Sequence, residues 1–220
     1  LMHYDILIED QSGRIFLENI VPRILTDGQT WCIRSYKGIG HVPKGLRPKH
    51  DARKRILLDQ LPRLIRGYGK SHSGYGADYP AALIIVCDLD NRDKDDFLTT
   101  LLGVLRSCNP APDTTFCLAI EEGEAWLLGD KTAILEAYPT AIRPILDSYV
   151  NDSICGTWEL LADAIYKGGS AALKEKGRSE AGIQKCEWAK RISPILRLED
   201  NRSPSFQFFR RTLTADKIDE

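Results

Sequence analysis

One run of seven apolar residues constrains the fold of this chain more than any other feature. It spans Ala81 to Cys87 and contains no charged side chain. A strand with one face in water alternates apolar and polar residues, whereas a strand covered on both faces is apolar throughout. The run therefore predicts a central strand of a parallel sheet. It ends in Asp88-Leu89-Asp90, so two acids directly follow the buried strand.

Shorter apolar segments on either side of this run alternate between strand and helix spacing. Strands are predicted at 4–8, 31–34 and 116–120, and helices at 15–24, 57–68, 97–105 and 126–128. The glycine-rich stretch 67–80 is expected to be a long loop. The connections between strands are too long for hairpins, which favours parallel pairing through crossovers. The expected fold class is α/β, a Rossmann-like, mainly parallel sheet with helices on both faces.

The last third of the chain has a different pattern. Its helical segments are separated by proline and glycine, at Pro139, Pro144, Gly168-Gly169, Gly177 and Pro194. Thr157 and Ser203 are expected N-caps, the second followed by Pro204 at the first helical position. We therefore expect a catalytic α/β core over residues 2–135 and a mainly helical C-terminal extension over residues 136–220, packed on the core.

Cysteine and histidine spacing excludes the common zinc sites. The six cysteines contain no C-x-x-C pair, and the four histidines contain no H-x-x-x-H pair. The apolar runs are too short to span a membrane, so no membrane association is expected. Charged residues interrupt the early apolar stretch, which argues against a signal peptide. The prediction is a cytoplasmic protein with reduced thiols.

The net charge of −1 conceals two opposed blocks. Residues 31–80 contain eleven Lys and Arg against three acids, and residues 81–136 contain eleven acids against four bases. Such blocks predict a basic surface beside an acidic cleft. This combination is typical of proteins that bind a polyanion near a metal.

Acids follow three of the predicted strands. They are Glu9 and Asp10, then Asp88 and Asp90, then Glu121, Glu122 and Glu124. Ligands of open parallel sheets bind outside the carboxyl ends of the strands, so we expect these acids to lie near one another. Asp93, Asp95 and Asp96 are better explained as the cap and first turn of the next helix.

The D-x-D segment carries the metal prediction. In an extended backbone its two carboxylates lie on one side, where they repel unless a cation lies between them. Carboxylate oxygens suit Mg²⁺ or Mn²⁺. We therefore expect a catalytic and metal site formed by Glu9, Asp88 and Asp90, with Glu121 and Glu124 as further metal ligands.

Three segments resemble a known family. Ile6-Leu7-Ile8-Glu9, the run from Ile84 to Asp90 and the segment from Ala119 to Leu128 are similar to the Toprim fold. More narrowly, they resemble bacterial Toprim-like proteins that are often encoded beside an ATPase. The resemblance covers residues 4 to 130, and Arg202-Ser203-Pro204-Ser205-Phe206 is similar to the C-terminal end of that subgroup.

The resemblance implies roles for individual residues. Glu9 would act as a general acid/base or metal ligand, and Asp88 and Asp90 would hold Mg²⁺. It also implies a nuclease with an ATPase partner protein and a role in defence against phage or plasmids. No Tyr or Ser stands out as a covalent nucleophile, which favours hydrolysis over topoisomerase chemistry.

The sequence departs from the family pattern in two places. Asp10 and Gly13 stand near positions where the family usually has a glycine and a second glutamate, and Asn91-Arg92-Asp93 follows the D-x-D without the frequent glycine. A catalytically degenerate module that binds nucleic acid or an ATPase therefore stays open as an alternative. A phosphate-accepting receiver domain is disfavoured by the D-x-D and by the absence of a lysine that ends a later strand.

A basic segment follows the second predicted strand. It comprises Arg34, Lys37, Lys44, Arg47, Lys49, Arg53, Lys54 and Arg55. Such charge can bind the nucleic-acid backbone, with Trp31 and Tyr36 stacking on unpaired bases, although charge runs are also typical of solvated loops. Lys37-Gly38-Ile39-Gly40 lacks the G-K-[ST] of a P-loop, so no ATP binding is predicted.

The function that these features favour is Mg²⁺- or Mn²⁺-dependent hydrolysis of a nucleic-acid phosphodiester. The acids of the predicted strand ends supply the chemistry and the basic segment supplies the binding. The choice between DNA and RNA is left open, and so is assembly into a homo-oligomer.

Overall fold

The computed structural model describes residues 2–38, 40–43, 56–76 and 78–214 and contains two compact units. Unit 1 comprises residues 1–14 and 26–118, and unit 2 comprises residues 15–25 and 119–220. The division differs from the one expected from the sequence, because it falls at residue 118 and assigns part of the first helix to the second unit.

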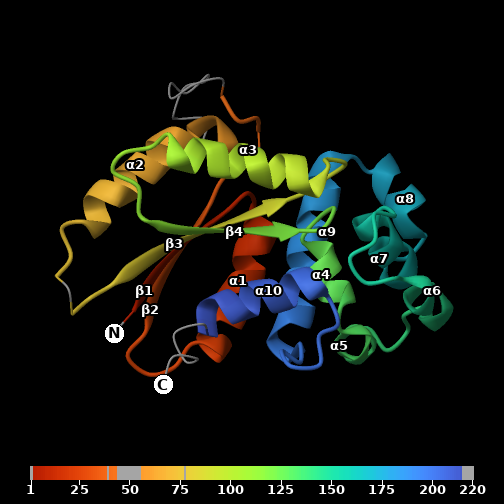
Figure 1. Ribbon diagram of the computed structural model, residues 1–220. Coiled ribbons are helices and arrows are strands. Elements are labelled where there is room, and N and C mark those ends of the chain that lie inside the picture. Colours follow the sequence, from red (N-terminus) through yellow and green to blue (C-terminus); the bar gives the residue numbers. More distant parts are fainter. Residues whose placement is uncertain (1, 39, 44–55, 77, 215–220) are drawn as a thin grey trace. The chain divides into compact units, whose positions relative to one another are not determined.

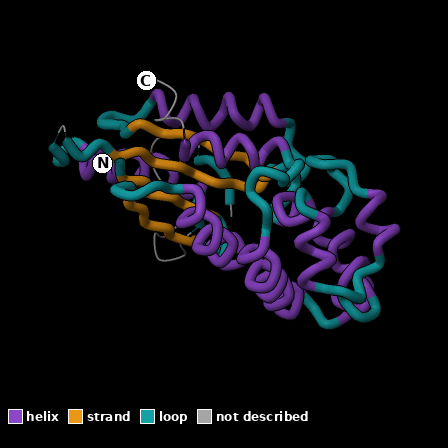
Figure 2. The backbone as a smooth tube through the Cα atoms, turned by 90° about the horizontal axis from the view of Figure 1, so that it is seen from below, coloured by secondary structure: helices purple, strands orange, loops and turns teal. Residues whose placement is uncertain are grey.

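The sheet has four strands that are all parallel. They are β1 (His3–Ile8), β2 (Thr30–Ser35), β3 (Ala81–Asp88) and β4 (Asp113–Ala119), in the order β2-β1-β3-β4. Figure 2 shows them side by side. Tyr4 pairs with Trp31 on one side and with Ala82 on the other, so β1 lies between β2 and β3. The predicted α/β class with a parallel sheet is confirmed.

Strand β3 is buried along nearly its whole length. Leu83, Ile84, Ile85 and Cys87 have no exposed surface, and Val86 is almost as inaccessible. The apolar run thus has the central position predicted for it, since β1 and β4 flank β3 on either side.

Two helices of unit 1 lie together on one face of the sheet (Figure 1). They are α2 (Leu61–His72), which follows a short 3-10 turn η2 (Leu58–Gln60), and α3 (Lys94–Arg106). Pro62 is compatible with α2 because it occupies the first turn, where its missing N–H costs nothing. The helix continues through Gly67 and Gly69, so the prediction of a loop from residue 67 was wrong over these residues.

Helix α1 (Gln11–Ile24) begins in unit 1 and ends in unit 2. Its N-cap is Asp10, whose carboxylate accepts hydrogen bonds from the Gly13 N–H and the Ser12 hydroxyl, both at 2.7 Å. A Cβ at Gly13 would lie 2.5 Å from Cδ1 of Ile8, so a larger residue there would force the Ile8 side chain to shift. The departure from the family pattern at Asp10 and Gly13 therefore corresponds to a helix cap.

Unit 2 is helical apart from the end of β4. Its helices are α4 (Glu124–Leu128), α5 (Lys131–Ala137), α6 (Arg143–Ser148), α7 (Thr157–Ile165), α8 (Gly169–Glu175), α9 (Arg178–Ile192) and α10 (Pro204–Thr214), with a 3-10 turn η3 (Ser193–Ile195). An aromatic cluster forms part of its core. The ring of Trp126 lies 5.2 Å from that of Phe209 and 5.8 Å from those of Phe16 and Phe206.

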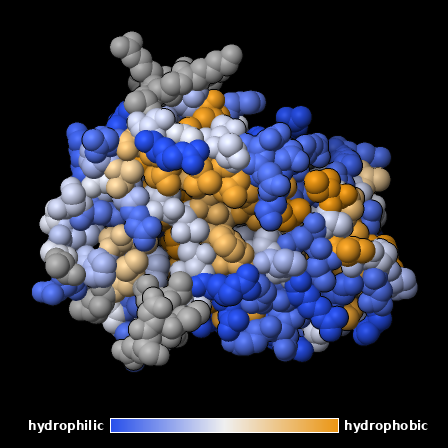
Figure 3. Space-filling view, viewed as in Figure 1, coloured by the Kyte–Doolittle hydropathy of each residue, from blue (hydrophilic) through white to orange (hydrophobic). Residues whose placement is uncertain are grey.

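The surface over α6 to α8 is mostly hydrophilic with separate hydrophobic spots (Figure 3). Exposed large apolar side chains of unit 2 are scattered along the chain, at Ile142, Val150, Ile154, Ile183 and Phe208. Single exposed apolar residues of this kind are normal for a folded protein and indicate no particular partner.

The start of α10 confirms the predicted cap at Ser203. Its hydroxyl accepts a hydrogen bond from the Phe206 N–H at 3.2 Å and donates one to Asp152 at 2.6 Å. Asp152 also accepts from the Ser205 N–H at 2.7 Å. The segment that resembles the family's C-terminal end is thus a buried helix start, held by a carboxylate from an earlier turn.

The two glycines of α2 give a matched test of this packing. A Cβ at Gly67 would meet nothing within 4 Å, whereas a Cβ at Gly69 would lie 2.5 Å from the carbonyl oxygen of Pro110. We expect Gly67→Ala to raise the free energy of unfolding by about 0.5–1 kcal/mol, because alanine has the higher helix propensity. Gly69→Ala should destabilise the protein by about 1–3 kcal/mol, because the backbone of the neighbouring turn must move. Urea unfolding of both variants checks this, and equal effects of the two substitutions would contradict the packing.

Candidate active site at the carboxyl ends of the strands

Glu9 and Asp88 meet at the carboxyl ends of two adjacent strands. Ile8, the last residue of β1, is in register with Val86, and β3 ends two residues later at Asp88. The two strands therefore end at the same edge of the sheet. A carboxylate oxygen of Glu9 accepts a hydrogen bond from the backbone N–H of Asp88 at 3.2 Å. Two acids that are 79 residues apart in the chain are therefore brought into contact by strand pairing.

The strand order makes this position distinctive. The chain passes from β1 to β2 on one side and then returns to β3 on the other side of β1. The connections thus diverge between β1 and β3, which is the switch point where open α/β sheets bind ligands. Glu9 and Asp88 stand at that point.

Both carboxylates affect a buried neighbour. Burial raises the pKa of the Cys87 thiol well above its ordinary value, and the charges of Glu9 and Asp88 raise it further. Arg92 acts in the opposite direction and more weakly. The charges of Glu9 and Asp88 are thus felt at the last buried residue of β3.

Asp90 is oriented differently from the prediction. Its backbone φ is +51°, so the chain has left the extended conformation that would align it with Asp88. Its carboxylate accepts a hydrogen bond from Arg92 Nη1 at 2.6 Å, and its side chain is 44% exposed. The guanidinium of Arg92 also lies 4.9 Å from the ring centre of Phe97. The same-side argument for the D-x-D was wrong at Asp90, because β3 ends at Asp88 and a turn begins.

The next acids cap α3, as predicted. Asp93 accepts hydrogen bonds from the N–H groups of Asp95 and Asp96, both at 3.0 Å. Asp95 and Asp96 lie in the first turn, where the helix dipole favours negative charge. These three acids therefore have structural roles.

Glu121, which was predicted as a metal ligand, caps a helix in unit 2. Its carboxylate accepts hydrogen bonds from the N–H groups of Cys155 at 3.2 Å, Gly156 at 2.8 Å and Thr157 at 2.8 Å. Thr157 is the first residue of α7, and Cys155 and Gly156 directly precede it. Thr157 was predicted as the N-cap, but Gly156 occupies that position and the distant carboxylate of Glu121 replaces a side-chain cap.

Glu124, the other predicted further ligand, is paired with a lysine. Lys185 of α9 lies 3.2 Å from Glu124 and 2.9 Å from Glu122. Its ammonium group is also 5.8 Å from the ring centre of Trp158. Burial raises the pKa of Glu122 to about 7, although Lys185 opposes the shift and Glu124 adds to it. Unit 2 thus contains a half-buried cluster of two acids and one cation.

The basic segment is described only in part. Lys44, Arg47, Lys49, Arg53, Lys54 and Arg55 lie outside the described residues. Lys37 is exposed just beyond β2. Arg34, whose side chain is 49% exposed, belongs to a network within unit 1, since its guanidinium donates to Asp5 at 2.8 Å and to the hydroxyl of Tyr68 at 2.9 Å.

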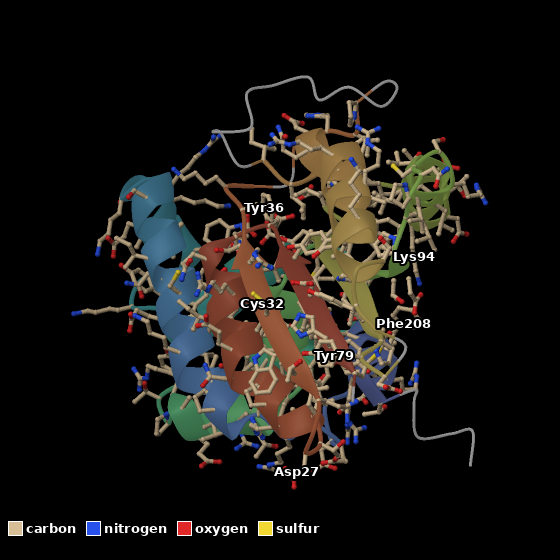
Figure 4. All side chains as sticks on the ribbon, turned by 90° about the vertical axis from the view of Figure 1, so that its left-hand side faces the viewer. Asp27, Cys32, Tyr36, Tyr79, Lys94 and Phe208 are labelled. Carbon is tan, nitrogen blue, oxygen red and sulfur yellow. The ribbon has the colours of Figure 1, made fainter. Side chains whose placement is uncertain are left out.

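Sequence reasoning missed the network around Asp5. This buried carboxylate also lies 3.0 Å from Nε2 of His72 and 3.5 Å from Nε2 of His3. Tyr75 stacks on His72 with ring centres 5.6 Å apart. Figure 4 looks onto the β2 edge beside this cluster. The sequence feature that could have indicated this network is Asp5 itself, an acid within the otherwise apolar first strand.

The residues at the switch point fit a hard cation in part. Among the described residues, no group of three or more His, Cys, Asp or Glu is placed to hold a metal ion. Glu9 nevertheless lies beside Asp88, from whose backbone N–H it accepts a hydrogen bond, and Mg²⁺ is commonly held by one or two carboxylates with water and substrate phosphates. Asp90 would become a ligand of such a cation only if its ion pair with Arg92 were broken.

Comparisons with known proteins add no family assignment. No protein-family model matches the sequence, and neither a curated protein nor a solved structure matches it. Within the described residues, each helix is too short or too polar to cross a membrane.

The Lys185 cluster predicts a pH-dependent loss of stability. Glu122 binds a proton more readily in the folded protein, so its ionisation between pH 4.5 and about 7 opposes folding as the pH rises. Lys185→Met removes the neutralising cation and raises the pKa of Glu122 further. We expect a loss of about 2–4 kcal/mol near pH 8 and a clearly smaller loss near pH 5.

Denaturant unfolding at the two pH values measures this difference. Lys190→Met is the matched control, because Lys190 lies on the same helix but pairs with the exposed Glu187 and should matter little at either pH. A loss for Lys185→Met that is the same at both pH values would contradict the assigned electrostatics.

Proposed function

We propose that unit 1 is a Toprim-like, Mg²⁺- or Mn²⁺-dependent phosphodiesterase that acts on nucleic acid. The observation that carries the proposal is the contact between Glu9 and Asp88 at the switch point between β1 and β3. Two acids at that position, on a sheet of this class, suit phosphoryl chemistry assisted by a cation. The resemblance of residues 4 to 130 to Toprim-like proteins supports the same activity.

Each carboxylate has a separate role in the proposal. Asp88 would coordinate the cation, since it is fixed as the last residue of a strand that is buried along nearly its whole length. Glu9 would accept a proton from the attacking water, and the hydrogen bond from the Asp88 N–H orients it. The bound cation would polarise the phosphoryl oxygen and stabilise the developing charge.

Asp90 would become a ligand only after it exchanges Arg92 for the cation. Its side chain is 44% exposed and that of Arg92 is 29% exposed, so the pair is held weakly against solvent. The exchange would release Arg92, a planar cation suited to phosphate, at the edge of the site. Glu121 and Glu124 have no role in this mechanism, because helix α7 and Lys185 engage them.

Substrate binding and partners complete the proposal. Lys37 and the basic residues between 44 and 55 would contact the phosphate backbone without regard to sequence. An ATPase partner protein and a role in defence are supported by the family resemblance alone.

Isosteric substitutions of the two acids test the activity. We expect Glu9→Gln and Asp88→Asn each to lower the Mg²⁺-dependent cleavage rate of labelled DNA or RNA by about 10²–10⁴-fold, because proton transfer and cation binding are lost. Asp113→Asn is the control, since Asp113 is exposed at the opposite end of the sheet, where β4 begins. Cleavage by both active-site variants at the wild-type rate would rule out this site.

A second function is favoured by one observation, the 2.6 Å contact between Asp90 and Arg92. If that pair persists, the unit is a module that binds nucleic acid or an ATPase without cleaving, as the departure after the D-x-D indicates. Calorimetric titration with Mn²⁺ separates the two functions. The enzyme predicts uptake of Mn²⁺ that Asp88→Asn abolishes and Arg92→Ala strengthens. A folded wild-type protein that takes up no Mn²⁺, while Arg92→Ala does, would identify the module.

A further inference from the structure

A pocket of about 410 Å³ lies between the end of β2 and helix α2 in unit 1. Its lining includes Tyr36, Arg63, Leu64, Gly67, Tyr68 and Ser71. The volume is within the range of about 300–1,000 Å³ that is usual for small-ligand sites. Two tyrosine rings and an arginine in one lining favour a flat, aromatic occupant.

Contacts with Arg34 hold the ring of Tyr68, which lines the pocket, in place. Its hydroxyl accepts a hydrogen bond from Arg34, whose guanidinium lies 5.8 Å from the ring centre and is itself held by the buried Asp5. Burial raises the pKa of the Tyr68 phenol, with Asp5 adding to the shift, so the ring stays neutral. A rigid, neutral ring loses little entropy when a second ring stacks on it.

Tyr36 of the lining belongs to a segment that is hydrogen-bonded to Ile8 and Glu9. The N–H of Tyr36 donates to the carbonyl of Ile8 at 2.9 Å, and the N–H of Gly38 donates to the carbonyl of Glu9 at 2.8 Å. The segment that carries Tyr36 is therefore bonded to the segment that carries the proposed general base (Figure 4 labels Tyr36). A ligand that extends from Glu9 along this segment would reach the residue that lines the pocket.

Helix α2 leaves room in the pocket at Gly67. A Cβ there would meet nothing within 4 Å, although the residue lies mid-helix, where alanine would be more stable. The side chain of Arg63, one turn earlier, is exposed and adds a positive charge on the same side of the helix.

We propose that this pocket holds an unpaired base of single-stranded nucleic acid, next to the phosphodiester on which Glu9 and Asp88 act. The proposal rests on the proposed function and specifies its substrate as single-stranded. A base in a duplex is already stacked on both faces and cannot enter, whereas an unpaired base offers a free face to Tyr36 and Tyr68. Arg63 would contact the flanking phosphate or stack on the base.

Binding in EDTA tests this inference without cleavage. The probes are fluorescein-labelled oligothymidylate and oligouridylate of about 10 nucleotides, the same sequence as a duplex, and an abasic strand of equal charge. For the wild type we expect the single strands to bind about 5–100-fold more tightly than the abasic strand, because one stacked base contributes about 1–3 kcal/mol. The duplex should bind no better than the abasic strand.

Gly67→Leu is the decisive variant because Gly67 lines the pocket and a Cβ there would meet nothing within 4 Å. This variant should bind the base-bearing and the abasic single strands with nearly equal affinity. Gly103→Leu is the matched control, since Gly103 is also a helical glycine whose Cβ would meet nothing within 4 Å, and it lies on α3. That control should keep the wild-type preference. Tyr68→Phe should keep it as well, whereas Tyr68→Ala should lose it.

Several outcomes would overturn the inference. For the wild type they are no binding of single strands, equal affinity for base-bearing and abasic strands, or a higher affinity for the duplex than for the single strands. For Gly67→Leu the contradicting outcome is the same preference for base-bearing over abasic strands as in the wild type. Failure of the proposed function is distinguishable. A base preference without metal-dependent cleavage leaves the pocket assignment standing, and cleavage without a base preference rejects the pocket assignment alone.

Discussion

The pairing of β1 with β3 is the interaction on which the rest of unit 1 depends. Both strands are almost wholly buried, so their register is set by apolar packing and a slip by one residue would expose the core face. The same register delivers the Asp88 N–H to the carboxylate of Glu9. The forces that stabilise the sheet therefore also position the two acids, and neither depends on a flexible loop for its placement.

Acids at the ends of strands and helices fall into two groups in this protein, and their partners separate them. Asp10, Asp93, Glu121 and Asp152 accept hydrogen bonds from N–H groups at the start of a helix, which satisfies donors that the helix leaves without partners. Glu9 instead reaches the N–H of the last residue of a neighbouring strand. The first group of acids is accounted for by helix capping. The contact of Glu9 stabilises no helix start, and it therefore supports a chemical role for this residue.

Sequence reasoning predicted the features that depend on neighbours in the chain. The burial of β3, the acids that follow it, the Asp93 cap and the Ser203 cap all follow from local pattern. It failed where the partner is remote or the backbone turns. Glu121 caps a helix 35 residues later, and Asp90 adopts a left-handed conformation that an extended D-x-D cannot show. The helix also passes through Gly67 and Gly69, since tertiary packing overrode the usual preference of glycine for loops.

Strand β1 shows how one element carries both kinds of acid. Asp5 lies within the strand and is almost fully buried, and its carboxylate is engaged by Arg34 and by Nε2 of His72, which leaves little of it open to a further cation. Glu9 lies beyond the strand end, is less buried, and interacts with a peptide N–H, which leaves its negative charge uncancelled by that contact. Asp5 thereby fixes Arg34 and Tyr68 beneath the pocket, whereas Glu9 remains at the edge where ligands arrive. The distance of an acid from the strand end, together with the charge of its partner, thus separates a structural carboxylate from one suited to catalysis.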